Sequence, residues 1–306
     1  MKIGAIVRKI NTSASSDIMR GIQTHTILNM YEIYVIPSLL NNAESWTLTK
    51  NDEKQLDQIG IRAVKRLFGL PTTSPNVAVI HTFGLFYISQ IVDKKRFLFL
   101  HKKLTSAEQW QCKMLLNMAS KNIGWAKNMN EKLSEYELET DWELIKQRSF
   151  NEWRNIVIRA VLIKNGKKLL ENCQTKINDG VKINTKTKHI YQELSEEVYK
   201  AEAKKSITEG TKQRARTIFL ARNGMLYCGK NMKGTIAEIC PECKVIDDEN
   251  HRLNICPKWG GAGNDDTDNE VEFNDIYSED SQTLNRVISK IENVWEVKFA
   301  NGRMKK

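Results

Sequence analysis

The sequence of residues 240–256 is CPECKVIDDENHRLNIC. Its three cysteines and one histidine have the spacing C-x2-C-x7-H-x4-C. The short gap between Cys240 and Cys243 fits a tight turn, which the proline inside it favours, and such a turn directs both sulfurs to one point. The gap between His251 and Cys256 slightly exceeds one helical turn, so both side chains can face the same ion. The predicted metal ligands are therefore Cys240, Cys243, His251 and Cys256.

Zinc is the metal that this set of ligands favours. Thiolate and imidazole ligands in a four-coordinate site suit Zn2+ better than magnesium or calcium. Four protein ligands leave no open position for a substrate, so the site is predicted to be structural. Cys228 remains an alternative ligand or a spare thiol, and the other two cysteines, Cys112 and Cys173, are expected to be small buried side chains. The competing explanation is that the spacing arose by chance among six cysteines.

The positive charge of the chain is unevenly distributed. The net charge is +10 over 306 residues. Residues 244–306 hold 9 basic and 13 acidic residues, so the preceding 243 residues carry about +14. A surplus of this size beside a zinc site favours nucleic acid over a membrane as the partner. The alternative is a soluble protein with an ordinary basic bias.

The cysteines and the apolar segments predict a soluble intracellular protein. Thiols that hold a metal require a reducing compartment, which means the nucleus or the cytoplasm. Residues 1–8 lack the long apolar run of a signal peptide. The most apolar stretches, residues 34–40 and 156–163, are too short to cross a bilayer.

Helical periodicity dominates up to about residue 220, so the predicted fold class is mainly α. Helices are expected at residues 16–28, 33–40, between Thr49 and Gly69, and at 76–83, 87–104, 108–119, 141–163, 188–203, 211–220 and 281–294. Residues 121–129 and 175–187 are expected to be loops, and residues 295–299 a short strand.

The helix between Thr49 and Gly69 has the clearest sequence signals. Thr49 and Asp52 match a capping box, and Gly69 followed by Pro71 is typical of a helix C-terminus. The apolar side chains expected on one face are Leu56, Ile59, Ala63 and Leu67. The basic side chains expected on the opposite face are Arg62, Lys65 and Arg66.

Two segments resemble the reverse transcriptases of non-LTR retrotransposons. Residues 34–49, YVIPSLLNNAESWTLT, are similar to the Y-x-x-P…Y-G-A-E-T-W-T-L segment that begins the helical thumb of these polymerases. Residues 62–69, 77–85 and 95–104 resemble the continuing thumb, and residues 222–226 with the cysteine–histidine cluster after them are similar to the knuckle region. Residues 248–257, DENHRLNICP, match the E-x-x-H-x-L-x-x-C-P shape of the zinc knuckle that follows the thumb. The resemblance covers residues 105–210 and the tail only loosely.

The resemblance implies four parts. These are a thumb-like helical domain at residues 1–120, a helical connector at 121–210, a basic helix plus CCHC zinc knuckle at 211–260, and an acidic linker with a terminal helix at 261–306. Asn41 and Asn42 stand where the family has Tyr-Gly. The family's palm, which holds two metal ions on paired aspartates, is absent, because the only adjacent aspartates lie in the knuckle and in the acidic linker. The expectation is a copy truncated at its 5′ end, without polymerase activity.

By this resemblance, the basic helices would contact the phosphates of an RNA template, an RNA–DNA hybrid or target DNA. The nominated residues are Arg62, Lys65, Arg66, Lys94, Lys95, Arg96, Lys102, Lys103, Lys212, Arg214, Arg216 and Arg222. For each of them, the alternative is a solvated surface charge. Aromatic groups that could stack on bases are Tyr227, Trp259 and His189, although packing roles are favoured for them. A full-length retrotransposon polymerase is a possible partner in trans.

Two other functions compete with this one. The zinc module could bind a protein, with the positive charge incidental. Alternatively, Asp280, Glu296 and Lys298 resemble a D…E-x-K nuclease site that some family members carry after the knuckle, although the segment is too short for the usual nuclease core.

Overall fold

The computed structural model describes residues 21–106, 108–178, 210–226, 228, 238–257, 272–278 and 280–299. These residues are mainly helical, which confirms the predicted fold class. In these ranges the only extended pairings are two isolated antiparallel bridges, one of which joins Ile239 to Ile246. The helix expected at 188–203 lies outside the described residues, as does most of the acidic linker.

The first described elements of the chain form one continuous helical segment. It consists of α3 (Thr24–Met30), the π-helical turn η1 (Tyr31–Val35) and α4 (Ile36–Leu39). Pro37 lies in the first turn of α4, where its missing N–H is tolerated, and the wider π turn precedes it. The prediction of helix on both sides of Pro37 is therefore confirmed.

The helix α5 (Lys50–Leu67) begins and ends as its sequence predicts. The backbone N–H groups of Thr49 and Asp52 bond reciprocally to each other's side chains, which completes the capping box. After a short 3-10 turn η2 (Ala43–Ser45), Trp46 is partly buried against the first core described below. Gly69 ends the helix with φ of +63°, a left-handed conformation that favours glycine.

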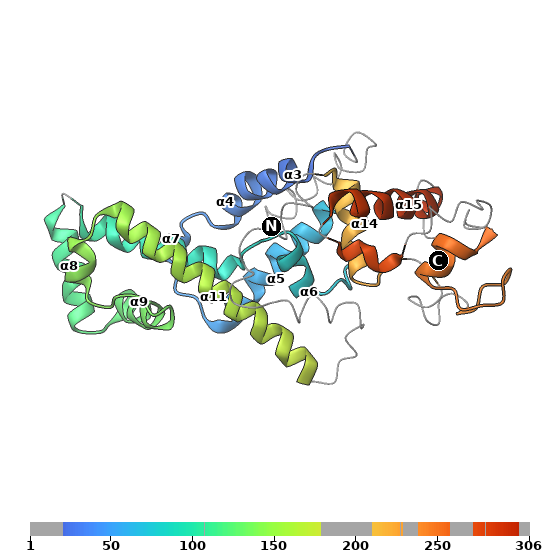
Figure 1. Ribbon diagram of the computed structural model, residues 1–306. Helices are drawn as coiled ribbons and strands as arrows, with labels where there is room; N and C mark the ends of the chain where they lie inside the picture. Colours follow the sequence, from blue (N-terminus) through green and yellow to red (C-terminus); the bar gives the residue numbers. More distant parts are fainter. Residues whose placement is uncertain are drawn as a thin grey trace.

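The helices α7 (Ile88–Leu104) and α11 (Phe150–Asn178) lie side by side in Figure 1. Each contributes to two separate hydrophobic cores. The first core contains Val92 of α7 and Leu169 of α11, whereas the second contains Phe97 and Trp153 of the same helices. The two helices therefore join the two halves of the molecule.

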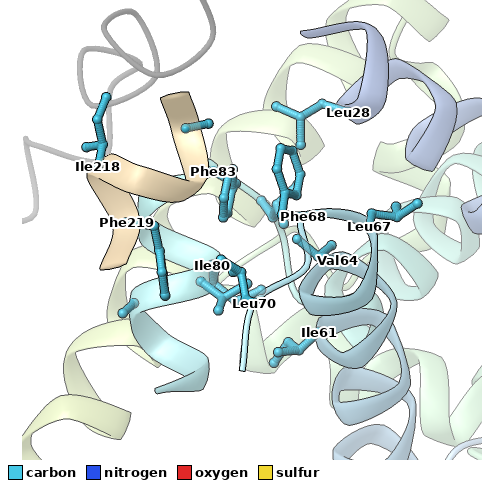
Figure 2. Packing of buried hydrophobic residues seen from close by; sticks show 14 of the residues in the cluster. Leu28, Ile61, Val64, Leu67, Phe68, Leu70, Ile80, Phe83, Ile218 and Phe219 are labelled. Atoms are coloured by element: carbon cyan, nitrogen blue, oxygen red, sulfur yellow. The ribbon is translucent and has the colours of Figure 1, made fainter. Parts of the chain in front are cut away.

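The first core gathers side chains from segments far apart in the sequence. Figure 2 shows α5, α6 (Asn76–Thr82) and α14 (Lys212–Arg222) meeting around three phenylalanine rings. Phe68 stacks on Phe83 with ring centroids 4.2 Å apart, and Phe83 stacks on Phe219 with centroids 6.0 Å apart. The C-terminal elements η6 (Phe273–Tyr277) and α15 (Ser281–Phe299) also pack into this core.

The second core is built from α8 (Gln109–Ser120), α9 (Gly124–Glu135) and α10 (Trp142–Gln147) against the ends of α7 and α11. The division expected at residue 120 falls inside this core and not between the two. The loop expected at residues 121–129 is wrong, because α9 begins at Gly124. Its buried side chains at Ala126, Met129 and Leu133 have helical spacing that the polar neighbours conceal.

The single helix expected at residues 141–163 is also wrong in its bounds. The chain breaks at Arg148, whose backbone is extended, and α11 then begins with the Ser149 hydroxyl accepting from the backbone N–H of Glu152. This S-x-x-E pair is a capping signal that the sequence contains. The helix α11 continues to Asn178, past the start of the loop expected at 175–187, and α15 reaches Phe299, so the strand expected at 295–299 is a helix.

Among the residues that the structure describes, no helix is both long and apolar enough to span a membrane.

Candidate metal centre and basic surface

The backbone of the Cys240–Cys243 turn is arranged as a tight loop. The N–H of Cys240 donates to the carbonyl of Val245 at 2.8 Å, and the N–H of Lys244 donates to the carbonyl of Cys240 at 2.9 Å. Lys244 has φ of +59°, the left-handed conformation that reverses the chain just after Cys243. The bridge between Ile239 and Ile246 closes the base of the loop. As predicted, this turn brings the two sulfurs to one point.

The four predicted ligands converge. One ligand atom from each of Cys240, Cys243, His251 and Cys256 can be chosen so that all four lie within 4.8 Å of one another. The Cys256 sulfur lies 3.8 Å from that of Cys240 and 3.7 Å from that of Cys243. A disulfide would place paired sulfurs about 2.05 Å apart, so these are separate thiols around a common centre. The group could hold a metal ion.

Among the four candidate ligands, His251 has the environment that most clearly favours a bound cation. It begins the π-helical turn η3 (His251–Ile255) and is only 2% exposed. Its backbone N–H donates to a carboxylate oxygen of Asp248 at 2.9 Å. Apart from the neighbouring Cys240 thiol, neither ring nitrogen has a hydrogen-bond partner among the described residues. A buried polar group without a partner is costly, and a coordinated cation would provide the partner.

The electrostatics of the turn favour a thiolate at Cys240. The backbone N–H groups of Cys243 and Glu242 bond to its sulfur, and the first of these is the largest cause that lowers the pKa of the Cys240 thiol. Burial, followed by the neighbouring Cys256, raises the pKa of Cys243 instead. Because a metal binds the thiolate, the turn supplies at least one sulfur in the form that a cation requires.

A buried ion pair and α15 fix the second half of the site. Arg252 bonds to both carboxylate oxygens of Asp247, with its Nε 2.6 Å from one of them, and both side chains are nearly inaccessible. Leu253 packs into the first core, and Lys290 of α15 donates to the side chain of Asn254 at 2.9 Å. These contacts hold η3 in place, so the candidate metal site is attached to the helical body.

The supporting roles of Asp247 and Asp248 were not predicted from the sequence. The signal was present, because an acidic pair shortly before a metal-binding histidine can cap the ligand's backbone and pair with the next base. Cys228, the alternative ligand, is buried but does not belong to the converging group.

Two of the twelve nominated basic residues are buried inside the helical body, which corrects the prediction for them. The Lys65 Nζ donates to the carbonyls of Thr72 and Ser74 at 3.0 and 2.5 Å, so this lysine fastens the loop after α5. Arg96 is 1% exposed and bonds to Asp93 and Asn128. The pattern of a helical face cannot distinguish a long basic side chain that folds back into the protein from one that reaches into solvent.

The other ten basic residues are exposed or half-buried. They are Arg62, Arg66, Lys94, Lys95, Lys102, Lys103, Lys212, Arg214, Arg216 and Arg222. Lys103 donates to the amide oxygen of Gln111, and Arg222 to the carbonyl of Ile276, both at 3.0 Å. Both of these acceptors are neutral groups.

Basic residues of α5 and α14, about 150 residues apart in the sequence, lie where the end of α5 meets α14. Arg66 lies in the last turn of α5, which Gly69 ends. The Nε of Arg216 lies 3.8 Å from the position that a Cβ on Gly69 would occupy. Burial lowers the pKa of Lys212, and the positive charge of Arg216 lowers it further. We call Arg66, Lys212 and Arg216 the α5–α14 basic cluster.

The separation of Asp280 and Glu296 along α15 argues against the nuclease alternative. Asp280 directly precedes this helix and accepts from the backbone N–H and the hydroxyl of Thr283, so it acts as a helix cap. Glu296 follows it by 16 residues on the same helix, which corresponds to about 24 Å along the axis. The backbone positions of the two residues are therefore far apart along the helix, which disfavours a shared ion.

Searches against known protein families, curated proteins and solved structures found no match to this chain.

Proposed function

We propose that this chain is a zinc-containing, nucleic-acid-binding protein, equivalent to the thumb and knuckle of a non-LTR retrotransposon reverse transcriptase without its palm. The observation that carries the binding proposal is the α5–α14 basic cluster. The sequence resemblance supplies the family, and the metal site supplies a fixed module next to the helical body.

Zinc is the proposed metal because the sulfur separations fit its geometry. Thiolate sulfurs about 2.3 Å from a tetrahedral zinc ion lie about 3.8 Å from one another. The two measured separations are 3.8 and 3.7 Å. Three thiolates and a buried imidazole also form a ligand set that favours zinc over harder cations. When bound, the ion would stabilise the knuckle and leave no position for a substrate.

Nucleic acid is the proposed partner because the α5–α14 basic cluster concentrates like charges. The positive charge of Arg216 acts unfavourably on Lys212, Arg66 lies in the last turn of the adjoining helix, and a bound polyanion would offset these like charges. Phosphate contacts of this kind are independent of sequence and release counterions, so they weaken steeply as salt rises. An RNA–DNA hybrid is the partner that the resemblance favours.

Polymerase chemistry is not part of the proposal. Asp247 and Asp248 are adjacent, but Asp247 pairs with Arg252, and Asp248 accepts from the backbone of His251. Both carboxylates therefore serve the metal module, and a palm would need such a pair free to hold two metal ions.

Neutralising two cations of the cluster should weaken binding and reduce its salt dependence. We expect the double variant Arg66→Gln/Lys212→Gln to bind an RNA–DNA hybrid about tenfold more weakly, and the slope of log affinity against log salt to fall by about two. Fluorescence anisotropy with a labelled hybrid over a salt series measures both quantities.

A matched control is available on the same helix. Lys50 and Lys54 are exposed at the opposite end of α5, so Lys50→Gln/Lys54→Gln removes equal charge away from the cluster. For this control, the slope of log affinity against log salt should stay closer to that of the parent than it does for Arg66→Gln/Lys212→Gln. Equal effects of the two pairs would mean that only net charge matters, and the cluster would then not be a binding site.

A second candidate function is docking of a protein on the zinc module. Four aliphatic side chains of the module, Ile239, Val245, Ile246 and Ile255, are between 45% and 61% exposed. Exposed apolar groups gathered in a small module are typical of protein interfaces. Absence of hybrid binding by the zinc-loaded parent at every salt concentration would favour this function over the first.

A further inference from the structure

Most of the net charge of this chain comes from one short segment. Residues 94–130 contain eight lysines and arginines and one acidic residue, Glu108, so they contribute +7 to a total of +10. The segment forms the C-terminal half of α7, all of α8 and the start of α9. In Figure 1 these helices lie at the opposite end of the elongated molecule from the orange segment that carries the metal ligands.

The outer face of α8 combines these charges with a large exposed aromatic side chain. Trp110 is 63% exposed, and Met114, one turn later, is 48% exposed. Lys113 is also exposed, and residues three and four apart on a helix are surface neighbours. The opposite face of α8 packs on the second core through Cys112, Leu115 and Leu116. Packing therefore does not explain why a tryptophan occupies position 110.

The ends of the neighbouring helices carry further cations. The sequence from residue 109 to residue 130 contains no carboxylate. Lys102 at the end of α7, Lys121 after α8 and Lys127 on α9 are all exposed. We define the α8 surface as Trp110, Lys113 and Met114 together with these three lysines. Its charge excludes a basic partner and suits a polyanion.

We propose that the α8 surface binds single-stranded nucleic acid, with a base stacked on Trp110 and phosphates near the lysines. A single strand presents unstacked bases, and an exposed indole can stack on any of them without reading sequence. In a duplex the bases are already stacked on one another, so Trp110 gains little there. The inference rests on the proposed nucleic-acid binding and adds a second contact region and the form of strand that it accepts.

The test compares single-stranded and duplex binding in the zinc-loaded full chain. The probes are a labelled thymidine oligonucleotide of about 20 nucleotides, longer than one typical binding site, and the RNA–DNA hybrid. We expect Trp110→Ala to weaken binding of the single strand roughly tenfold, while affinity for the hybrid changes by less than about twofold. Trp110→Phe, which keeps an aromatic face, should retain most of the affinity for the single strand.

Tyr34→Ala is the control, because Tyr34 is 57% exposed on η1, away from the α8 surface. It should leave both affinities unchanged. Unaltered binding of the single strand by Trp110→Ala would overturn the inference, as would an equal loss for both probes. Loss of self-association, with unchanged affinity for the single strand, would overturn it in favour of a contact between copies of the chain. A parent that binds the hybrid but not the single strand overturns this inference alone, whereas a parent that binds neither overturns the proposed function as well.

Discussion

Replacing Cys243 with serine is expected to weaken zinc binding by at least about a hundredfold. The substitution removes one of four converging ligands and puts a neutral hydroxyl in place of a thiolate, so the shell around the ion opens. Changes to groups that only support a ligand already cost about ten- to a hundredfold in affinity, and loss of a ligand itself should cost more. Titration of the metal-free chain against a zinc-binding dye measures the affinity.

The matched control for this experiment is Cys112→Ser. Cys112 is a buried cysteine of α8 in the second core, outside the converging group. Its replacement makes the same chemical change and should leave one zinc ion per chain with the affinity of the parent. If Cys243→Ser bound zinc as tightly as this control, Cys243 would not be a ligand.

Replacing Trp153 with alanine is expected to destabilise the protein by about 3–5 kcal/mol. The Trp153 ring is fully buried in the second core, and its indole N–H donates to the carbonyl of Phe97 on α7 at 2.9 Å. The Trp153 ring also stacks on the ring of His101 in α7, with ring centroids 6.5 Å apart. Removing it leaves a cavity where α11 packs on α7. Urea denaturation of the zinc-loaded chain gives the free energy of unfolding.

The same substitution at an exposed tryptophan provides the comparison. Trp110→Ala removes a side chain that is mostly in solvent, so the free energy of unfolding should change by no more than about 0.5 kcal/mol. Similar losses for the two variants would contradict the packing of α11 on α7 through Trp153.

The sequence predicted those parts of the fold whose signals are local. The capping box at Thr49 and Asp52, the stop at Gly69 and the two-residue gap between Cys240 and Cys243 each specify a conformation within a few residues. These features appear in the structure as expected. The metal site could be predicted for the same reason, because all four ligands lie within one short segment.

The parts that depend on tertiary contacts could not be predicted in this way. Lys65 and Arg96 lie among other basic residues in the sequence, and only the packing of the loop after α5 and of α9 buries them. The proximity of Arg216 to Gly69 at the end of α5 depends on the packing of α14 beside α5 and α6, which no local pattern encodes. The exposure of Trp110 depends on which face of α8 packs on the second core, and that is also a tertiary contact.

The two hydrophobic cores place the α5–α14 basic cluster and the α8 surface in different halves of the molecule. The metal site is attached through Leu253 and Lys290 to the first core, which also holds α5 and α14. The second core carries the α8 surface, and α7 and α11 run through both. A nucleic acid bound at both the α5–α14 basic cluster and the α8 surface would follow the length of these two helices. Such a two-site contact would make binding more salt-dependent than either site alone.

X-ray absorption at the zinc edge of the purified parent chain tests the metal site most directly. We expect one zinc ion per chain, with three sulfur neighbours at about 2.3 Å and one nitrogen neighbour at about 2.0–2.1 Å. A protein that is folded around residues 240–256 without any metal, or a zinc ion surrounded only by oxygen and nitrogen, would contradict the account.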